Sequence, residues 1–215
     1  NVDLSYFAEN NLPIPQTLEE LTEPQYSGLL VVENPATSSP GLAFLLATIA
    51  HFGEEGYLDY WAALRDNDVV VVNDWNTAYY TNFTQAGQGE QPMVVSYASS
   101  PVAEVVFAEQ PPEEAPTGSI VGPQACFRQV EFVGILRGTQ NRALAEQFID
   151  FMLSEPFQED IPLQMFVFPV NPNAQLPEEF EQFAQMPEQP AAMDPQLIGD
   201  NRETWVQGWT EVVLQ

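Results

Sequence analysis

Residues 69–80 read VVVVNDWNTAYY. Four consecutive valines are typical of an extended strand, and a run without polar residues predicts that this strand is buried. Asp74 follows almost at once and can cap the first turn of a helix that runs through Tyr79 and Tyr80. The stretch therefore predicts a buried strand that leads directly into a helix.

A second junction of the same design lies earlier in the chain. Leu29–Glu33 is predicted to form a strand, and Gly41–Phe52 a helix. Ser39 is predicted to cap this helix, Pro40 suits its first position, and Gly53 ends it.

A third junction follows at Met93–Tyr97, a predicted strand, with Ser99-Ser100-Pro101 opening a helix that reaches about Ala108. Apolar strands that alternate with helices predict an α/β fold with a largely parallel sheet and flanking helices. Beyond these junctions the patterns predict helices near 57–64, 141–153, 177–186 and 201–213, and a short strand at 166–170.

Composition excludes several classes of function. The 215 residues carry a formal net charge of -26, with 31 acidic residues against five basic ones, all arginine. Such an acidic chain repels polyanions, so nucleic acid is not an expected partner. One cysteine, Cys126, and one histidine, His51, exclude an internal disulfide and a Cys/His metal cage. No apolar run approaches the roughly 20 residues of a membrane span, and residues 1–20 show no signal-peptide pattern.

The three junctions predict a ligand site. In a parallel sheet they lie at the carboxyl ends of the strands, where α/β proteins bind ligands. Hydroxyl and amide groups of Ser38, Ser39 and Gly41 would then form an anion or hydroxyl site at a helix N-terminus. Trp75 and Tyr97 would add aromatic faces that suit a flat or cationic ligand. The alternatives are that Ser39 is only a helix cap and that the two aromatic residues belong to the core.

Catalytic and metal-binding hypotheses find less support. Ser39 and His51 lie at opposite ends of one predicted helix, about 18 Å apart at 1.5 Å per residue, too far for a catalytic pair. Tyr79 and Tyr80 could offer phenolates to ferric iron, but neighbours on a helix point about 100° apart, so one core and one surface residue is the alternative. No pair of carboxylates stands out as an acid–base dyad.

Three stretches resemble the thiamine-binding subunits of bacterial ABC importers. They are ATSSPGLAFLLATIAHFGEEGYLDYWAAL (36–64), VVVVNDWNTAYYTNFTQAGQGEQPMVVSYASSP (69–101) and AEQFIDFMLSEPFQEDIPLQMFVFPVNP (145–172). These importers use the periplasmic-binding-protein class, which also holds ferric-iron and polyamine receptors. The resemblance implies a type II periplasmic-binding-protein fold, mostly its second lobe, because the family's first segment would precede Asn1. Residues 1–128 would belong to the second lobe, 129–165 to a return segment of the first lobe, and 166–215 to the second lobe again.

The resemblance also implies a ligand site. Ser38 and Ser39, with Gly41 beside them, would hold the hydroxyethyl or phosphate end of the vitamin, while Trp75 and Tyr97 line the site. Phe166 stands where the family usually has a tryptophan beside the ligand, and Ala103 where it often has a stacking tyrosine.

The function that this resemblance implies is an extracytoplasmic receptor that binds thiamine or thiamine phosphate and delivers it to an ABC permease. No reaction, cofactor or metal is expected. The location would be periplasmic or extracellular, with a lipid anchor as one option for the full-length protein. The alternatives are a ferric-iron or polyamine receptor of the same class, or an enzyme on a similar scaffold.

Overall fold

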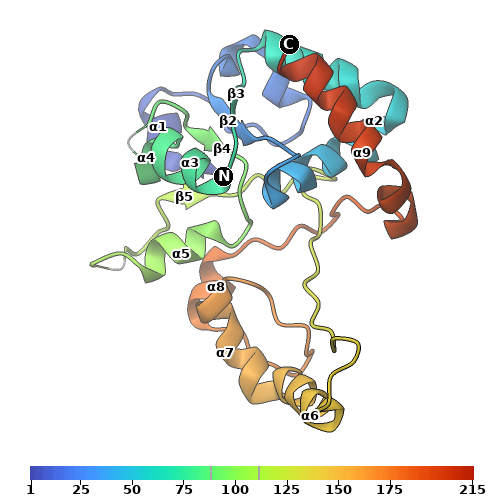
Figure 1. The fold of residues 1–215 in the computed structure, drawn as a ribbon. Coiled ribbons are helices and arrows are strands. Elements are labelled where there is room, and N and C mark those ends of the chain that lie inside the picture. Colours follow the sequence, from blue (N-terminus) through green and yellow to red (C-terminus); the bar gives the residue numbers. More distant parts are fainter. Residues whose placement is uncertain (88, 111) are drawn as a thin grey trace. The chain divides into compact units, whose positions relative to one another are not determined.

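The computed structural model describes residues 1–87, 89–110 and 112–215, and the chain divides into two compact units (Figure 1). Unit 1 comprises Asn1–Ala98, Pro116–Arg128 and Gln185–Gln215. Unit 2 comprises Ser99–Ala115 and Gln129–Ala184. The assignment of 1–128, 129–165 and 166–215 to the lobes of a receptor stays a prediction.

Unit 1 is built on a five-stranded mixed sheet of order β3-β2-β4-β1-β5. Its parallel part consists of β2 (Leu30–Glu33) between β3 (Val70–Val72) and β4 (Met93–Val94), which are the three predicted strands. The two-residue strands β1 (Val2–Asp3) and β5 (Thr117–Gly118) extend the sheet in antiparallel fashion. The α/β prediction is thus confirmed, with a parallel centre and an antiparallel margin.

The burial predicted for the valine strand is wrong. All three residues of β3 are only half-buried, because β3 lies at the edge of the sheet and pairs with β2 alone. The neighbouring strand β2, which is paired on both sides, is instead fully buried, including Glu33 at its end.

Helices of unit 1 cover the sheet. The longest are α2 (Ser39–Asp66) and α9 (Pro195–Val213), which pack together through an edge-to-face contact of Trp61 and Trp209 at 5.5 Å between ring centroids. Gly53 interrupts α2 with φ 75° and ψ 169°, so the predicted break is confirmed. The shorter elements are α1 (Leu4–Glu9), the 3-10 turns Glu20–Thr22 and Pro24–Tyr26, α3 (Trp75–Thr77), the π-helical turn η3 (Ala78–Asn82) and α4 (Thr84–Gly87).

Unit 2 contains α5 (Ser100–Val106), α6 (Arg142–Met152), α7 (Glu155–Met165) and α8 (Glu178–Phe183). The strand predicted at 166–170 is wrong. Phe166 ends α7 in the left-handed conformation, and the side-chain oxygen of Gln158 accepts hydrogen bonds from the N–H groups of Val170 (2.7 Å) and Asn171 (3.3 Å). A side chain thus satisfies backbone donors that a neighbouring strand would otherwise bind.

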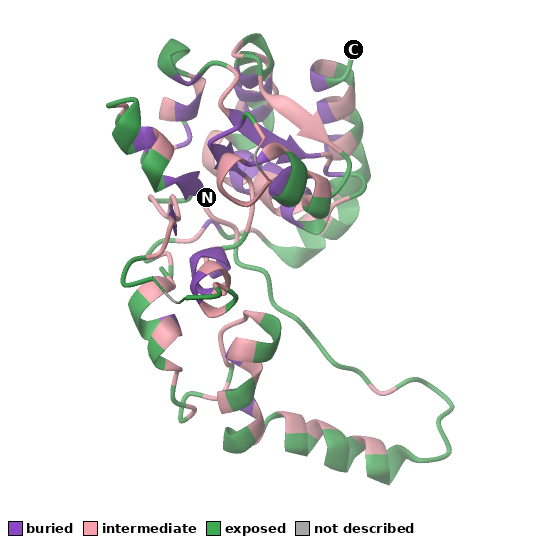
Figure 2. Ribbon diagram, turned by 90° about the vertical axis from the view of Figure 1, so that its left-hand side faces the viewer, coloured by how far each residue is buried: buried purple, intermediate pink, exposed green. Residues whose placement is uncertain are grey.

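Buried residues concentrate on the sheet of unit 1 and the helices against it, whereas α6 of unit 2 contains none (Figure 2). Among the residues described, no helix combines the length and the apolar character that crossing a membrane requires.

Gly41 allows the first turn of α2 to pack against the end of β2. A Cβ atom at this position would press on the carbonyl oxygen of Glu33 and lie 2.9 Å from its carbonyl carbon. We expect Gly41→Ala to lower the free energy of unfolding by about 1–3 kcal/mol, the usual cost of overpacking, as measured by urea denaturation. Gly199→Ala is the matched control because its Cβ, in α9, would meet nothing within 4 Å. That change should raise stability slightly, and an equal response to both would contradict the packing argument.

Candidate functional site

Three strand-to-helix junctions meet at one edge of the sheet. The hydroxyl of Thr37, after β2, donates to the carbonyl oxygen of Asn73, after β3, at 2.6 Å. The indole N–H of Trp75 donates to the hydroxyl of Ser96, after β4, at 2.8 Å. The predicted common rim is therefore present, and hydrogen bonds hold its segments together.

Four aromatic side chains gather on this rim, and we call them the aromatic corner: Trp75, Tyr79, Tyr80 and Tyr97. Tyr79 stacks on Trp75 at 4.8 Å between centroids and an angle of 23°. Tyr80 meets Trp75 edge to face at 5.5 Å and 83°, and Tyr97 approaches it at 6.0 Å and 52°. The structure thus brings Trp75 and Tyr97 together as the sequence predicts.

The residue before Trp75 carries a negative charge that hydrogen bonds hold in place. Asp74 caps α3, and its carboxylate accepts hydrogen bonds from the backbone N–H and the hydroxyl of Thr77, both at 2.9 Å. These bonds, the backbone one foremost, hold the pKa of Asp74 below its usual value. An exposed, ionised carboxylate therefore precedes Trp75 directly in the chain.

The serines occupy the start of α2, but the predicted cap is off by one residue. Ser38, not Ser39, is the N-cap residue, and its side chain makes no capping hydrogen bond. Among the described residues, the buried hydroxyl oxygen of Ser38 has no hydrogen-bond partner. Ser39 is the first helical residue and is exposed, while Gly41 is buried against Glu33.

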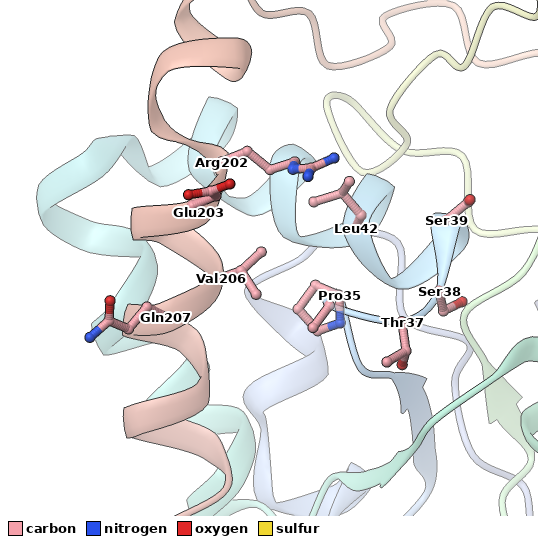
Figure 3. A pocket seen from close by; sticks show the side chains of 10 residues that line it. Pro35, Thr37, Ser38, Ser39, Leu42, Arg202, Glu203, Val206 and Gln207 are labelled. Atoms are coloured by element: carbon pink, nitrogen blue, oxygen red, sulfur yellow. The ribbon is translucent and has the colours of Figure 1, made fainter.

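A pocket of about 510 Å³ lies between this helix start and α9 (Figure 3). In Figure 3, Val206 of α9 points toward Pro35 and Leu42, and the hydroxyls of Ser38 and Ser39 lie at the end away from α9. Arg202 and Glu203 bring opposite charges to the α9 wall. The aromatic corner is not part of the lining, so the serines, but not Trp75 or Tyr97, border this pocket.

Phe166 belongs to unit 2, unlike the other predicted site residues. Its ring lies 5.4 Å from that of Phe107 and stacks on Phe180 at 6.5 Å, and its carbonyl oxygen accepts a hydrogen bond from the hydroxyl of Ser99 at 2.6 Å. Its contact with a ligand stays a prediction.

The two adjacent tyrosines divide between core and surface. Tyr79 is 3% exposed, whereas Tyr80 is 58% exposed. This arrangement matches the structural interpretation of the pair rather than a pair of accessible phenolates. Within residues 1–87, 89–110 and 112–215, no group of three or more His, Cys, Asp and Glu side chains is placed to hold a metal ion.

His51 makes local contacts with two polar side chains. Its Nε2 lies 2.7 Å from the carboxylate of Glu19, and its Nδ1 lies 3.1 Å from the side-chain oxygen of Gln124. Glu19 accordingly has a lowered pKa, because the His51 hydrogen bond favours its charged form.

Comparison with known proteins assigns the chain to a protein class. A family described as bacterial extracellular solute-binding proteins matches residues 7–189. The chain therefore belongs to the bacterial extracellular solute-binding protein family.

Its relatives in this family include thiamine-binding periplasmic proteins. The chain is 30% identical to that of Brucella suis over 96% of its own length and 61% of the relative's, and 29% identical to that of Escherichia coli K12 over 98% and 63%. A solved structure of a periplasmic thiamin binding protein superposes with a TM-score of 0.76 at 28% identity, covering 95% of this chain and 61% of that one. The periplasmic-binding-protein fold is confirmed, and the chain spans about 60% of the length of these curated relatives.

Proposed function

We propose that this chain is the ligand-binding part of an extracytoplasmic receptor that delivers thiamine or thiamine phosphate to an ABC permease. The aromatic corner on the rim carries the proposal. It presents Trp75 with Tyr80 and Tyr97 beside it, and the exposed carboxylate of Asp74 belongs to the residue that precedes Trp75. Aromatic faces near negative charge attract a flat cation such as the thiazolium ring. Thiamine-binding relatives over 96% of the chain support the same ligand.

Such a receptor works by binding alone. Its ligand would lie with a ring against Trp75 and its hydroxyethyl or phosphate end toward Ser38 and Ser39, where the helix start offers N–H groups and hydroxyls. Closure around the ligand would expel water and produce the form that the permease recognises. No reaction is part of this mechanism, and a periplasmic location, with or without a lipid anchor, follows from the proposed role.

Mass spectrometry of the ligand released from natively purified protein tests the proposal. We expect thiamine or its phosphate. Recovery of iron or a polyamine would select the alternative receptors of the same class, and turnover of an added thiamine compound would indicate an enzyme.

Trp75 is expected to contribute most of the aromatic contact. Trp75→Ala should weaken thiamine binding by about 1–3 kcal/mol, the scale of an aromatic hot spot, in a calorimetric titration. Trp75→Phe keeps an aromatic ring, so this variant should lose much less affinity for thiamine. Circular dichroism verifies that both variants fold. Unchanged affinity in the alanine variant would remove Trp75 from the site.

Ser38 and Ser39 are expected to distinguish the phosphate ester from the free alcohol. Replacing both by alanine removes two hydroxyls, one of them the buried and unpartnered oxygen of Ser38, as assessed over the described residues. The affinity for thiamine phosphate should fall about tenfold further than the affinity for thiamine, since hydrogen bonds to a charged group are stronger than those to a neutral one. Thiamine is the internal control, and equal losses for both ligands would show that the serines do not contact the phosphate.

A further inference from the structure

Tyr80 has the exposure and orientation of a ligand-facing wall. Its side chain is 58% exposed, yet it contacts two other rings of the aromatic corner. It meets Trp75 at 5.5 Å and 83°, and Tyr79 at 5.4 Å and 76°. Tyr79 is buried and stacks on one face of the half-buried Trp75, whereas Tyr80 and Tyr97 are exposed, so the accessible walls of the corner are Trp75, Tyr80 and Tyr97.

A π-helical turn places Tyr80 there. In an α-helix, positions five residues apart are rotated by about 140° and face different directions. Here Ala78–Asn82 is π-helical, and the N–H of Phe83 donates to the carbonyl oxygen of Ala78 at 2.9 Å, a bond that spans five residues. The wider turn lets both Tyr79 and Tyr80 reach Trp75. Single π-helical turns are rare and occur frequently at functional sites.

The three accessible side chains Trp75, Tyr80 and Tyr97 have the chemistry of a cation site. Trp75 and Tyr80 stand nearly perpendicular, as in aromatic cages that enclose quaternary nitrogen. The ionised Asp74 is held by two hydrogen bonds at the start of the same helical segment. An aromatic wall with a carboxylate nearby favours a positively charged ring over an uncharged ring of the same shape.

We propose that Tyr80 is the third wall of this corner and selects for the positive charge of the bound ring. The inference rests on the proposed function and deepens it: Trp75 supplies stacking to any flat ligand, whereas Tyr80 makes the site prefer the thiazolium cation. Its phenol ring, rather than its hydroxyl, performs this role.

Two ligands and three variants test the inference. Thiamine carries the cationic ring, and thiochrome, its flat oxidation product, is uncharged. Binding is measured by calorimetry for thiamine and by fluorescence for thiochrome, in the complete protein that contains these residues. Tyr80→Leu keeps an apolar side chain but removes the ring, Tyr80→Phe keeps the ring, and Tyr6→Leu removes a tyrosine elsewhere in unit 1.

We expect Tyr80→Leu to weaken thiamine binding about tenfold and thiochrome binding less than about twofold, the difference being the scale of a cation–π contact. Tyr80→Phe and Tyr6→Leu should stay within about twofold of the unmodified protein for both ligands. Equal losses for the two ligands, or none, would overturn the inference and leave the proposed function standing. Failure of the unmodified protein to bind thiamine would overturn both.

Discussion

Raising the pH from 5 to 8 is expected to cost the protein roughly 3 kcal/mol of stability through Glu33 alone. This carboxyl group ends the interior strand β2, is 0% exposed, and has no hydrogen-bond partner for either oxygen among the described residues. Burial penalises its charged form and raises its pKa from 4.5 to about 8.

The direction of this pH dependence follows from the number of protons that each state binds. Between about pH 4.5 and pH 8, folded Glu33 keeps its proton while unfolded Glu33 loses it. The folded state therefore binds more protons, and stability falls as pH rises through this window.

Urea denaturation of Glu33→Gln at pH 5 and pH 8 isolates the carboxyl contribution, because all other titratable groups are the same in both proteins. The variant should lose clearly less stability over this range than the unmodified chain. Glu9→Gln, at an exposed position in α1, is the control and should leave the stability difference between pH 5 and pH 8 unchanged. Parallel pH dependences in all three proteins would show that Glu33 is solvated or paired in solution.

Local signals predicted the parallel part of the fold because they lie within a few residues of the structures that they specify. The valines of β3, the Asp74 cap and the Gly53 break each act through backbone preferences of their own segment. Strands β1 and β5 gave no such signal. Each has only two residues. Val2 pairs with Met93 and Gly118, which lie far away in the sequence, so these strands are defined only once the chain has folded.

Misleading signals had equally specific causes. The run FVFPV at 166–170 has the composition of a strand, but Gln158, eight residues earlier, binds its backbone. The positions of Trp75 and Tyr97 on the rim were predictable because Trp75 follows a recognisable strand and Tyr97 ends one. The position of Tyr80 was not predictable. In a regular α-helix it would point away from Trp75, and only the π-helical turn brings the two rings together. The burial of Glu33 likewise depends on Gly41, which packs against it from another element.

A protein of the relatives' full length that contains these residues is expected to bind thiamine at least about 100-fold more tightly than residues 1–215 alone, since small-molecule sites normally enclose about 70–90% of their ligand. In this chain Tyr80 and Tyr97 are 58% and 41% exposed. A ring that rests on these walls therefore keeps much of its other surface in water.

Weaker enclosure would reduce affinity in two ways. The outer face of the ligand would gain fewer apolar contacts, and water would screen the attraction between its positive ring and Asp74, which is itself exposed. Calorimetric titration of both proteins in the same buffer measures the difference, with Trp75→Ala in each as the control for binding at the aromatic corner. If residues 1–215 already bind through the corner, the alanine change should abolish their weak binding while only reducing that of the longer protein. Comparable affinities of the two unmodified proteins would show instead that residues 1–215 enclose the ligand by themselves.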